Sequence, residues 1–242
     1  MKGNDDSAVE NLIRELGDAH KTVQRRAIDE LVALAAAGNP LVAERLRGSV
    51  ANVDRRVRWA AAFALGQIGA GAFAMDSADA LCEAMADDDG DIRWAATNLM
   101  VQLGRDNLSE IGARLLELAA AGDRNARKMA LYCIRDLELS GPELLAVLER
   151  AVHDSDVHVR LAALSVLSRI RDASGHAVRI MLECLKADPD AGVRRAAASA
   201  LGNIRSADAD AITALTSAAA DLADESLARA ARGALNRLEK RS

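Results

Sequence analysis

A repeat of about 34 residues runs along the whole chain, and it limits the possible folds more than any other feature of the sequence. One apolar position sets the register, and its seven occurrences lie 33 to 35 residues apart: Val23, Val57, Ile92, Ala126, Val159, Val193 and Leu227. Each is followed four residues later by an alanine, without exception: Ala27, Ala61, Ala96, Ala130, Ala163, Ala197 and Ala231. A fixed period of this length is typical of proteins that stack one supersecondary unit many times. The sequence therefore predicts seven stacked units.

Each unit is predicted to be a pair of helices. Apolar side chains stand eight residues after the reference position, on the same helix face as the reference position and the alanine: Leu31, Leu65, Met100, Ile134, Leu167, Leu201 and Leu235. Aspartates stand three residues before the reference position, where a carboxylate caps the first turn of a helix: Asp54, Asp89, Asp123, Asp156, Asp190 and Asp224. A second apolar-periodic segment, such as 144–152, precedes each cap. The expected fold is all-α, without a central globular core.

These residues resemble a known family. The run from Asp54 to Gly69, with Val57-Arg58 and Ala61 in phase, resembles the HEAT repeat, particularly the short variety of the phycobilisome lyases and many bacterial proteins. The run from Asp190 to Ile204 matches as well. The resemblance implies a right-handed α-solenoid, or α–α superhelix, of about seven hairpins and a single domain over residues 1–242. The expected repeats are 6–38, 39–72, 73–106, 107–139, 140–173, 174–206 and 207–242.

The resemblance also implies a role for the aspartates and arginines that recur at fixed positions in the repeats. An arginine follows the reference position in five units, and the two columns would form a bonded ladder between adjacent repeats: Asp54, Arg58, Asp89, Arg93, Asp123, Arg127, Asp156, Arg160, Asp190 and Arg194. These residues are therefore interpreted as structural. His20 and Gln24 replace the pair in the first unit, and Ala228 replaces the arginine in the last. Because both ladders stop there, the array is expected to be complete.

The sequence offers no recognisable catalytic site. The histidines are His20, His153, His158 and His176, and none form the i, i+4 pair of a helical metal site. His153-Asp154 is not the His-Glu dyad of the HEAT-repeat iron hydroxylases. The three cysteines are widely spaced, and Cys133 falls on the predicted buried face, so free buried thiols are expected. We predict no catalytic residue, no metal and no cofactor.

The predicted location is the cytoplasm. The first six residues contain no apolar signal-peptide region, and no stretch approaches 18 uninterrupted apolar residues, so membrane insertion is not expected.

The predicted binding surface lies on the second helix of each unit, because these helices line the concave face in HEAT-type solenoids. Four of the five aromatic residues fall two or six positions after the reference, opposite the predicted core: Trp59, Phe63, Trp94 and Tyr132. The predicted concave patch adds Asn98, Lys128, Leu131 and Leu161. Clustered exposed aromatic rings indicate a partner-binding surface, whereas rings that fold inward would only fill gaps between helices. Both interpretations are open at this point.

Charge is unevenly distributed between the two helices of the units. The second helices sum to +7, and since the whole chain carries −5, the remainder carries −12. This asymmetry would direct an acidic partner toward the concave face. Nucleic acid is not favoured, because the overall pI is about 5.5 and most of the arginines belong to the predicted ladder.

Three classes of function are compatible with these features. The leading hypothesis is a non-enzymatic scaffold or adaptor that binds a protein or peptide in its concave groove. The second is a bilin-lyase-like or cofactor-chaperone protein, in which the aromatic patch holds a tetrapyrrole or another flat molecule. The third is a HEAT-like DNA-repair glycosylase.

Overall fold

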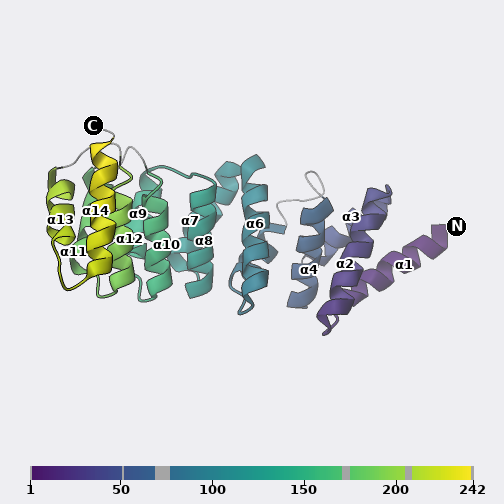
Figure 1. The fold of residues 1–242 in the computed structure, drawn as a ribbon. Coiled ribbons are helices and arrows are strands. Elements are labelled where there is room, and N and C mark those ends of the chain that lie inside the picture. The colour runs from purple at the N-terminus through teal and green to yellow at the C-terminus, as the bar shows by residue number, and fades with distance from the viewer. Residues whose placement is uncertain (1, 51, 69–76, 171–174, 205–208, 241–242) are drawn as a thin grey trace. The chain divides into compact units, whose positions relative to one another are not determined.

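The described residues form helices and loops, without a strand. In the computed structural model these residues are 2–50, 52–68, 77–170, 175–204 and 209–240. They contain fourteen α-helices, which confirms the predicted all-α fold of paired helices (Figure 1). The helices are α1 (Lys2–Glu15), α2 (Lys21–Ala36), α3 (Pro40–Ser49), α4 (Arg55–Ile68), α5 (Ser77–Met85), α6 (Gly90–Asp106), α7 (Leu108–Ala121), α8 (Arg124–Asp136), α9 (Pro142–Ala151), α10 (Val157–Leu167), α11 (Gly175–Ala187), α12 (Ala191–Leu201), α13 (Ala209–Ala219) and α14 (Glu225–Glu239).

The contacts between helices divide the chain into two units. Unit 1 comprises residues 1–111 and unit 2 residues 112–242. A single array over residues 1–242 therefore stays a prediction. The predicted repeat boundaries at 72/73, 173/174 and 206/207 lie at or within stretches outside the described residues.

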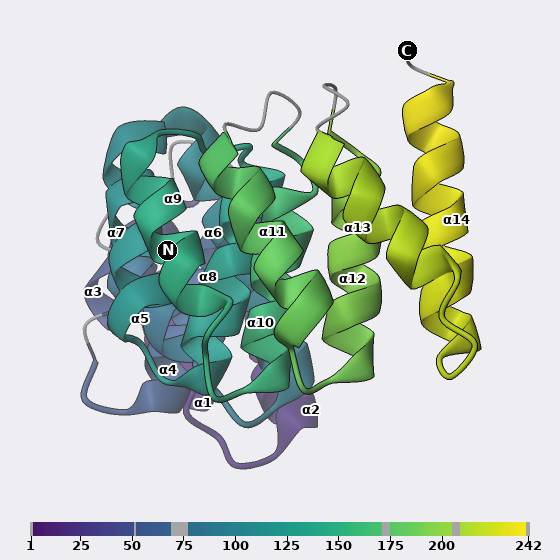
Figure 2. The ribbon, with the colours of Figure 1, turned by 90° about the vertical axis from the view of Figure 1, so that its left-hand side faces the viewer.

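Unit 2 has two layers of helices. The second helices α8, α10, α12 and α14 pack side by side in chain order, while α11 and α13 pack against each other in the other layer (Figure 2). In unit 1, α2 packs against α4 in the same way, but α4 packs less closely against α6.

The capping aspartates define where the second helices begin. The Asp89 carboxylate accepts a hydrogen bond from the backbone N–H of Asp91, and the Asp156 carboxylate accepts from His158 and Val159. Asp123, Asp190 and Asp224 cap their helices in the same way, and the Asp54 carboxylate accepts from the N–H of Arg56 at the start of α4. The predicted helix starts are therefore confirmed.

The alanine column lies in the buried face of the second helices. All seven alanines have no exposed surface: Ala27, Ala61, Ala96, Ala130, Ala163, Ala197 and Ala231. Glycine serves a similar purpose five residues later. A Cβ atom on Gly202 would lie 2.6 Å from Cα and Cβ of Ala234, so this glycine allows α12 to approach α14. Small side chains thus set the spacing between adjacent second helices.

Candidate interaction site

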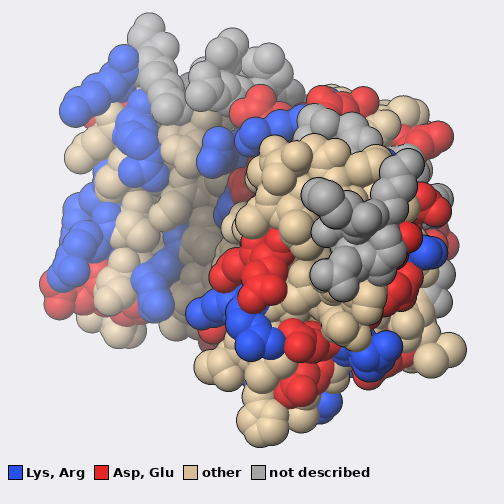
Figure 3. All heavy atoms as spheres, turned by 90° about the vertical axis from the view of Figure 1, so that its right-hand side faces the viewer, with Lys and Arg blue, Asp and Glu red and all other residues tan. Residues whose placement is uncertain are grey.

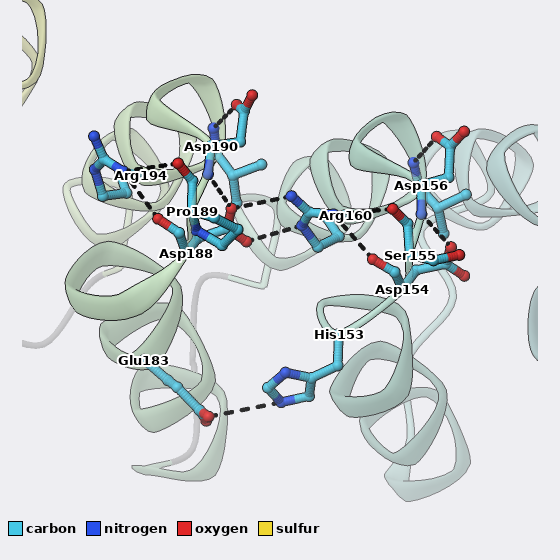
Figure 4. Close-up of polar contacts among 12 residues, drawn as sticks. His153, Asp154, Ser155, Asp156, Arg160, Glu183, Asp188, Pro189, Asp190 and Arg194 are labelled. Atoms are coloured by element: carbon cyan, nitrogen blue, oxygen red, sulfur yellow. Dashed lines mark hydrogen bonds and ion pairs between the residues drawn. The ribbon is translucent and has the colours of Figure 1, made fainter.

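The hairpins of unit 2 are tied together by a ladder of arginines and aspartates (Figure 4). Arg160 of α10 donates from Nε and Nη2 to the two carboxylate oxygens of Asp188, at 2.9 and 3.1 Å, and from Nη1 to the backbone carbonyl of Asp154. Arg127 of α8 binds the Asp154 carboxylate in the same two-pronged way, at 2.7 and 2.9 Å. Each arginine therefore fixes the turn before its own helix and the equivalent turn of the next hairpin.

These pairs are largely buried. The Arg160 and Asp188 side chains are only 11% and 5% exposed. At Asp154, burial is the largest influence and opposes ionisation. Hydrogen bonds from Arg127 and from the N–H of Asp156 outweigh it and hold the pKa of the carboxyl below its ordinary value. The Arg127–Asp154 pair consequently stays ionised at neutral pH.

The structure corrects the predicted partners of the arginines. The resemblance implies a ladder between the arginine column and the capping aspartates of adjacent repeats, but Arg127 and Arg160 bind Asp154 and Asp188, which stand two residues before the caps. The capping carboxylates are already occupied by backbone N–H groups of their own helix. Arg194 does lie near a capping aspartate, with Nη2 3.6 Å from Oδ2 of Asp224.

Unit 1 contains a looser version of the ladder. Arg58 of α4 donates to Glu83, whose side chain is 50% exposed, and to the backbone carbonyl of Asn52. Arg93 of α6 donates to the carbonyl of Asp87. In unit 1, Arg58 therefore joins two hairpins through a glutamate. This side chain is longer and more exposed to solvent than the aspartates of the unit 2 ladder.

A cavity of about 280 Å³ lies beside the unit 2 ladder, between the turn after α9 and the end of α11. His153 and Glu183 face each other across it, with 3.8 Å between Nε2 and Oε1 (Figure 4). Cys184 also lines the cavity, and burial raises the pKa of its thiol to about 12. This thiol stays protonated at neutral pH, so it is not an activated nucleophile.

Four predicted binding residues of unit 1 lie on the surface of adjacent second helices. Trp59 and Phe63, one turn apart on α4, are half-buried and have their ring centroids 5.2 Å apart. Trp94 of α6 is 49% exposed, which is unusual for a ring of this size. Asn98, one turn further along α6, is also exposed. These rings do not fold fully into the interior.

The predicted residues of unit 2 divide into two groups. Lys128, Tyr132 and Leu161 are half-buried, and the Arg135 guanidinium lies 5.0 Å from the centroid of the Tyr132 ring. Leu131, however, is completely buried, so its placement on the binding surface is wrong.

The reason for this error is that each second helix inside a stack is covered on its sides as well as on its inner face. The column that contains Leu131 is buried in six consecutive second helices, at Ile28, Ala62, Thr97, Leu131, Leu164 and Ala198. All six are apolar or small, and that pattern was available in the sequence.

A mixed-charge cleft of about 590 Å³ opens in unit 1 where α2, α4 and α6 begin. Its lining includes Trp59, Arg55, Asp87, Lys21 and Asp89, and we call it the unit 1 cleft. Arg55 lies 3.2 Å from Asp87, and Lys21 Nζ lies 2.6 Å from Oδ2 of Asp89. On the nearer part of the face shown in Figure 3, acidic and basic side chains are likewise interspersed.

Two other kinds of site are absent from the part of the chain that the structure describes. Within it, no three histidine, cysteine or carboxylate side chains gather as a metal site would require. None of its helices combines the length and apolar character needed to cross a membrane.

Comparisons with known proteins agree with the helical-repeat class that this fold defines. The model for HEAT repeats matches residues 8–100, the model for a single HEAT repeat matches 177–204, and the model for the PBS lyase HEAT-like repeat matches 193–221. The chain belongs to the HEAT-repeat proteins. No curated protein sequence matches it.

Solved structures with a similar fold have little sequence similarity to the chain. An archaeal HEAT-like repeat protein from Thermococcus onnurineus has a TM-score of 0.58 at 13% identity, with 97% of this chain and 98% of that chain covered. The Escherichia coli protein YibA has a TM-score of 0.57 at 18% identity, with 100% and 97% covered. At these identities the likeness shows the fold alone.

Proposed function

We propose that this protein is a non-enzymatic interaction scaffold that binds a protein segment or peptide on the surface of its second helices. The observation that carries the proposal is the exposure of Trp94 on α6 beside the half-buried Trp59–Phe63 pair on α4. Aromatic side chains contribute strongly to binding when a partner removes them from water.

The polar groups near these rings favour a peptide as the occupant. The Asn98 side chain lies one turn from Trp94, and an amide both donates and accepts hydrogen bonds, as a peptide backbone requires. Lys128, Tyr132 and Leu161 of unit 2 are proposed as further contact residues, while Leu131 is excluded by its burial.

The proposal is tested by a matched pair of alanine variants. Trp94→Ala should weaken partner binding by more than about 1 kcal/mol while changing the melting temperature little. The control is Leu108→Ala, because Leu108 is 47% exposed but belongs to α7, a first helix. Partners are captured with immobilised wild-type protein, and the affinity of each variant for a captured partner is then measured by calorimetry.

Several outcomes would contradict the proposal. If Trp94→Ala binds every captured partner like wild type, or lowers the melting temperature like a core truncation, the rings are packing residues. Salt-sensitive binding of duplex DNA would favour the nucleic-acid alternative. A visible absorbance band gained on adding bilin, and lost in Trp94→Ala, would favour the cofactor-chaperone alternative.

A further inference from the structure

The unit 1 cleft differs in charge from the second helices as a whole. Its lining carries five carboxylates and three cationic groups, which leaves it with a net charge of −2, whereas the second helices together are basic. The carboxylates are Asp18, Asp54, Glu83, Asp87 and Asp89. A cleft of this charge favours a cationic occupant over an anionic one.

The chain's own lysine already shows how one carboxylate of the cleft binds an ammonium group. Lys21, at the start of α2, reaches Asp89, at the start of α6, so the bond joins the first hairpin to the third across the α4 start. The hydrogen bond to Lys21 is the main influence that lowers the pKa of Asp89, followed by the capping bond from Asp91. The Lys21 side chain is 79% exposed, so little packing is lost if it moves away.

Trp59 supplies an apolar surface in the same cleft. Its contact with Phe63 leaves it half-buried and supported from α4, while part of it lines the cleft. Aromatic rings attract guanidinium and ammonium groups, and carboxylates nearby increase that preference.

Resting on the proposed function, we propose that the unit 1 cleft binds an arginine or lysine side chain of the partner segment, which replaces Lys21 at Asp89 and contacts Trp59. Arg55 does not compete in the same way, because Asp87 and the backbone carbonyl of Glu83 hold its guanidinium.

The first test uses three probe peptides that differ only in charge. Each is Ac-(Ser-Leu-Xaa-Ala)₃-NH₂, with Xaa as arginine, glutamine or glutamate, and binding is followed by calorimetry and tryptophan fluorescence. The arginine peptide should bind at least about threefold more tightly than the glutamine peptide, and the glutamate peptide most weakly.

The second test changes the two residues of the Lys21–Asp89 pair in opposite directions. Lys21→Met removes the internal competitor and should tighten binding of the arginine peptide, whereas Asp89→Asn should abolish the preference for arginine over glutamine. Asparagine still caps a helix, so the start of α6 is retained. Lys186→Met, at an exposed position on α11 of unit 2, is the control for the loss of one positive charge and should leave the preference unchanged.

The outcomes separate this inference from the proposed function. If all three peptides bind equally and Trp94→Ala weakens all of them, the scaffold proposal is supported and the cationic site is overturned. A preference for arginine that persists in Asp89→Asn also overturns the cationic site. If no peptide binds, both proposals are contradicted.

Discussion

Unit 1 and unit 2 are built from the same repeat but hold their hairpins together differently. In unit 2 the Arg160–Asp188 pair is almost fully buried, and the reference positions of all four second helices are buried. In unit 1 the Glu83 side chain that binds Arg58 is half exposed, and the reference residues Val23 and Ile92 are only partly buried. Tight packing and polar ties thus coincide in unit 2.

The large aromatic side chains are concentrated in unit 1, where the packing and the polar ties are looser. Trp59, Phe63 and Trp94 all belong to unit 1, where α4 and α6 pack less closely. The same repeat can therefore either stabilise a stack or leave a surface open for binding. A complete ladder stabilises a stack, whereas a looser stack leaves large rings and a cleft accessible to a partner.

The largest expected difference between the units comes from removing one ladder arginine from each. Arg160→Leu leaves the Asp188 carboxylate buried without its partner and should lower the free energy of unfolding by roughly 3 kcal/mol. Arg58→Leu leaves a solvated Glu83 and should lower it by less than about 1 kcal/mol. Urea denaturation followed by circular dichroism measures both. Equal losses would show that the two ladders are energetically the same.

A smaller difference is expected from enlarging the buried alanine. Ala163→Leu in unit 2 should overpack the stack and cost roughly 1–3 kcal/mol, and Ala61→Leu in unit 1 should cost less because its surroundings are looser. Ala113→Leu, on the exposed face of α7, is the control. An unchanged melting temperature for Ala163→Leu would contradict its burial.

The mildest test leaves the protein unaltered and compares thiol reactivity. Cys82 of unit 1 is half-buried, whereas Cys133 and Cys184 of unit 2 are buried and the pKa of Cys184 is raised to about 12. Native protein treated with iodoacetamide at pH 8 should therefore be alkylated first at Cys82, as peptide mass spectrometry would show. Faster labelling of Cys184 would indicate that unit 2 opens more readily than unit 1.

The sequence predicted the fold well because the same weak indications of a helix recur at the same place in successive repeats. A single aspartate before an apolar segment is a modest indication of a helix start, but six in register fixed the starts of six second helices. The alanine column likewise predicted the buried face of the second helices. Both features depend on local spacing along one helix, which the sequence records directly.

The site was harder to predict because it depends on contacts between hairpins. Leu131 was placed on the binding surface by a helix-face argument that considered only the partner helix of the same hairpin. However, α8 also packs against the second helix α10, and Leu131 is completely buried. The acid partners of the arginines were missed for the same reason. Asp154 and Asp188 stand two residues before the capping aspartates. Which of the two aspartates an arginine binds depends on how far its side chain reaches into the next hairpin, and spacing along one helix does not give that reach.

The position of the ladder gives unit 2 a direction in which it bends most easily. The bonds from Arg127, Arg160 and Arg194 all lie at the turns where the second helices begin, so they restrain one edge of the stack. Toward the other ends of the second helices, a weaker tie to an uncharged acceptor joins α14 to α12, where Arg237 donates to the backbone carbonyl of Ser199 at 3.3 Å. A load applied across the hairpins would therefore separate them at the far edge first, with the arginine edge acting as the axis of an elastic hinge.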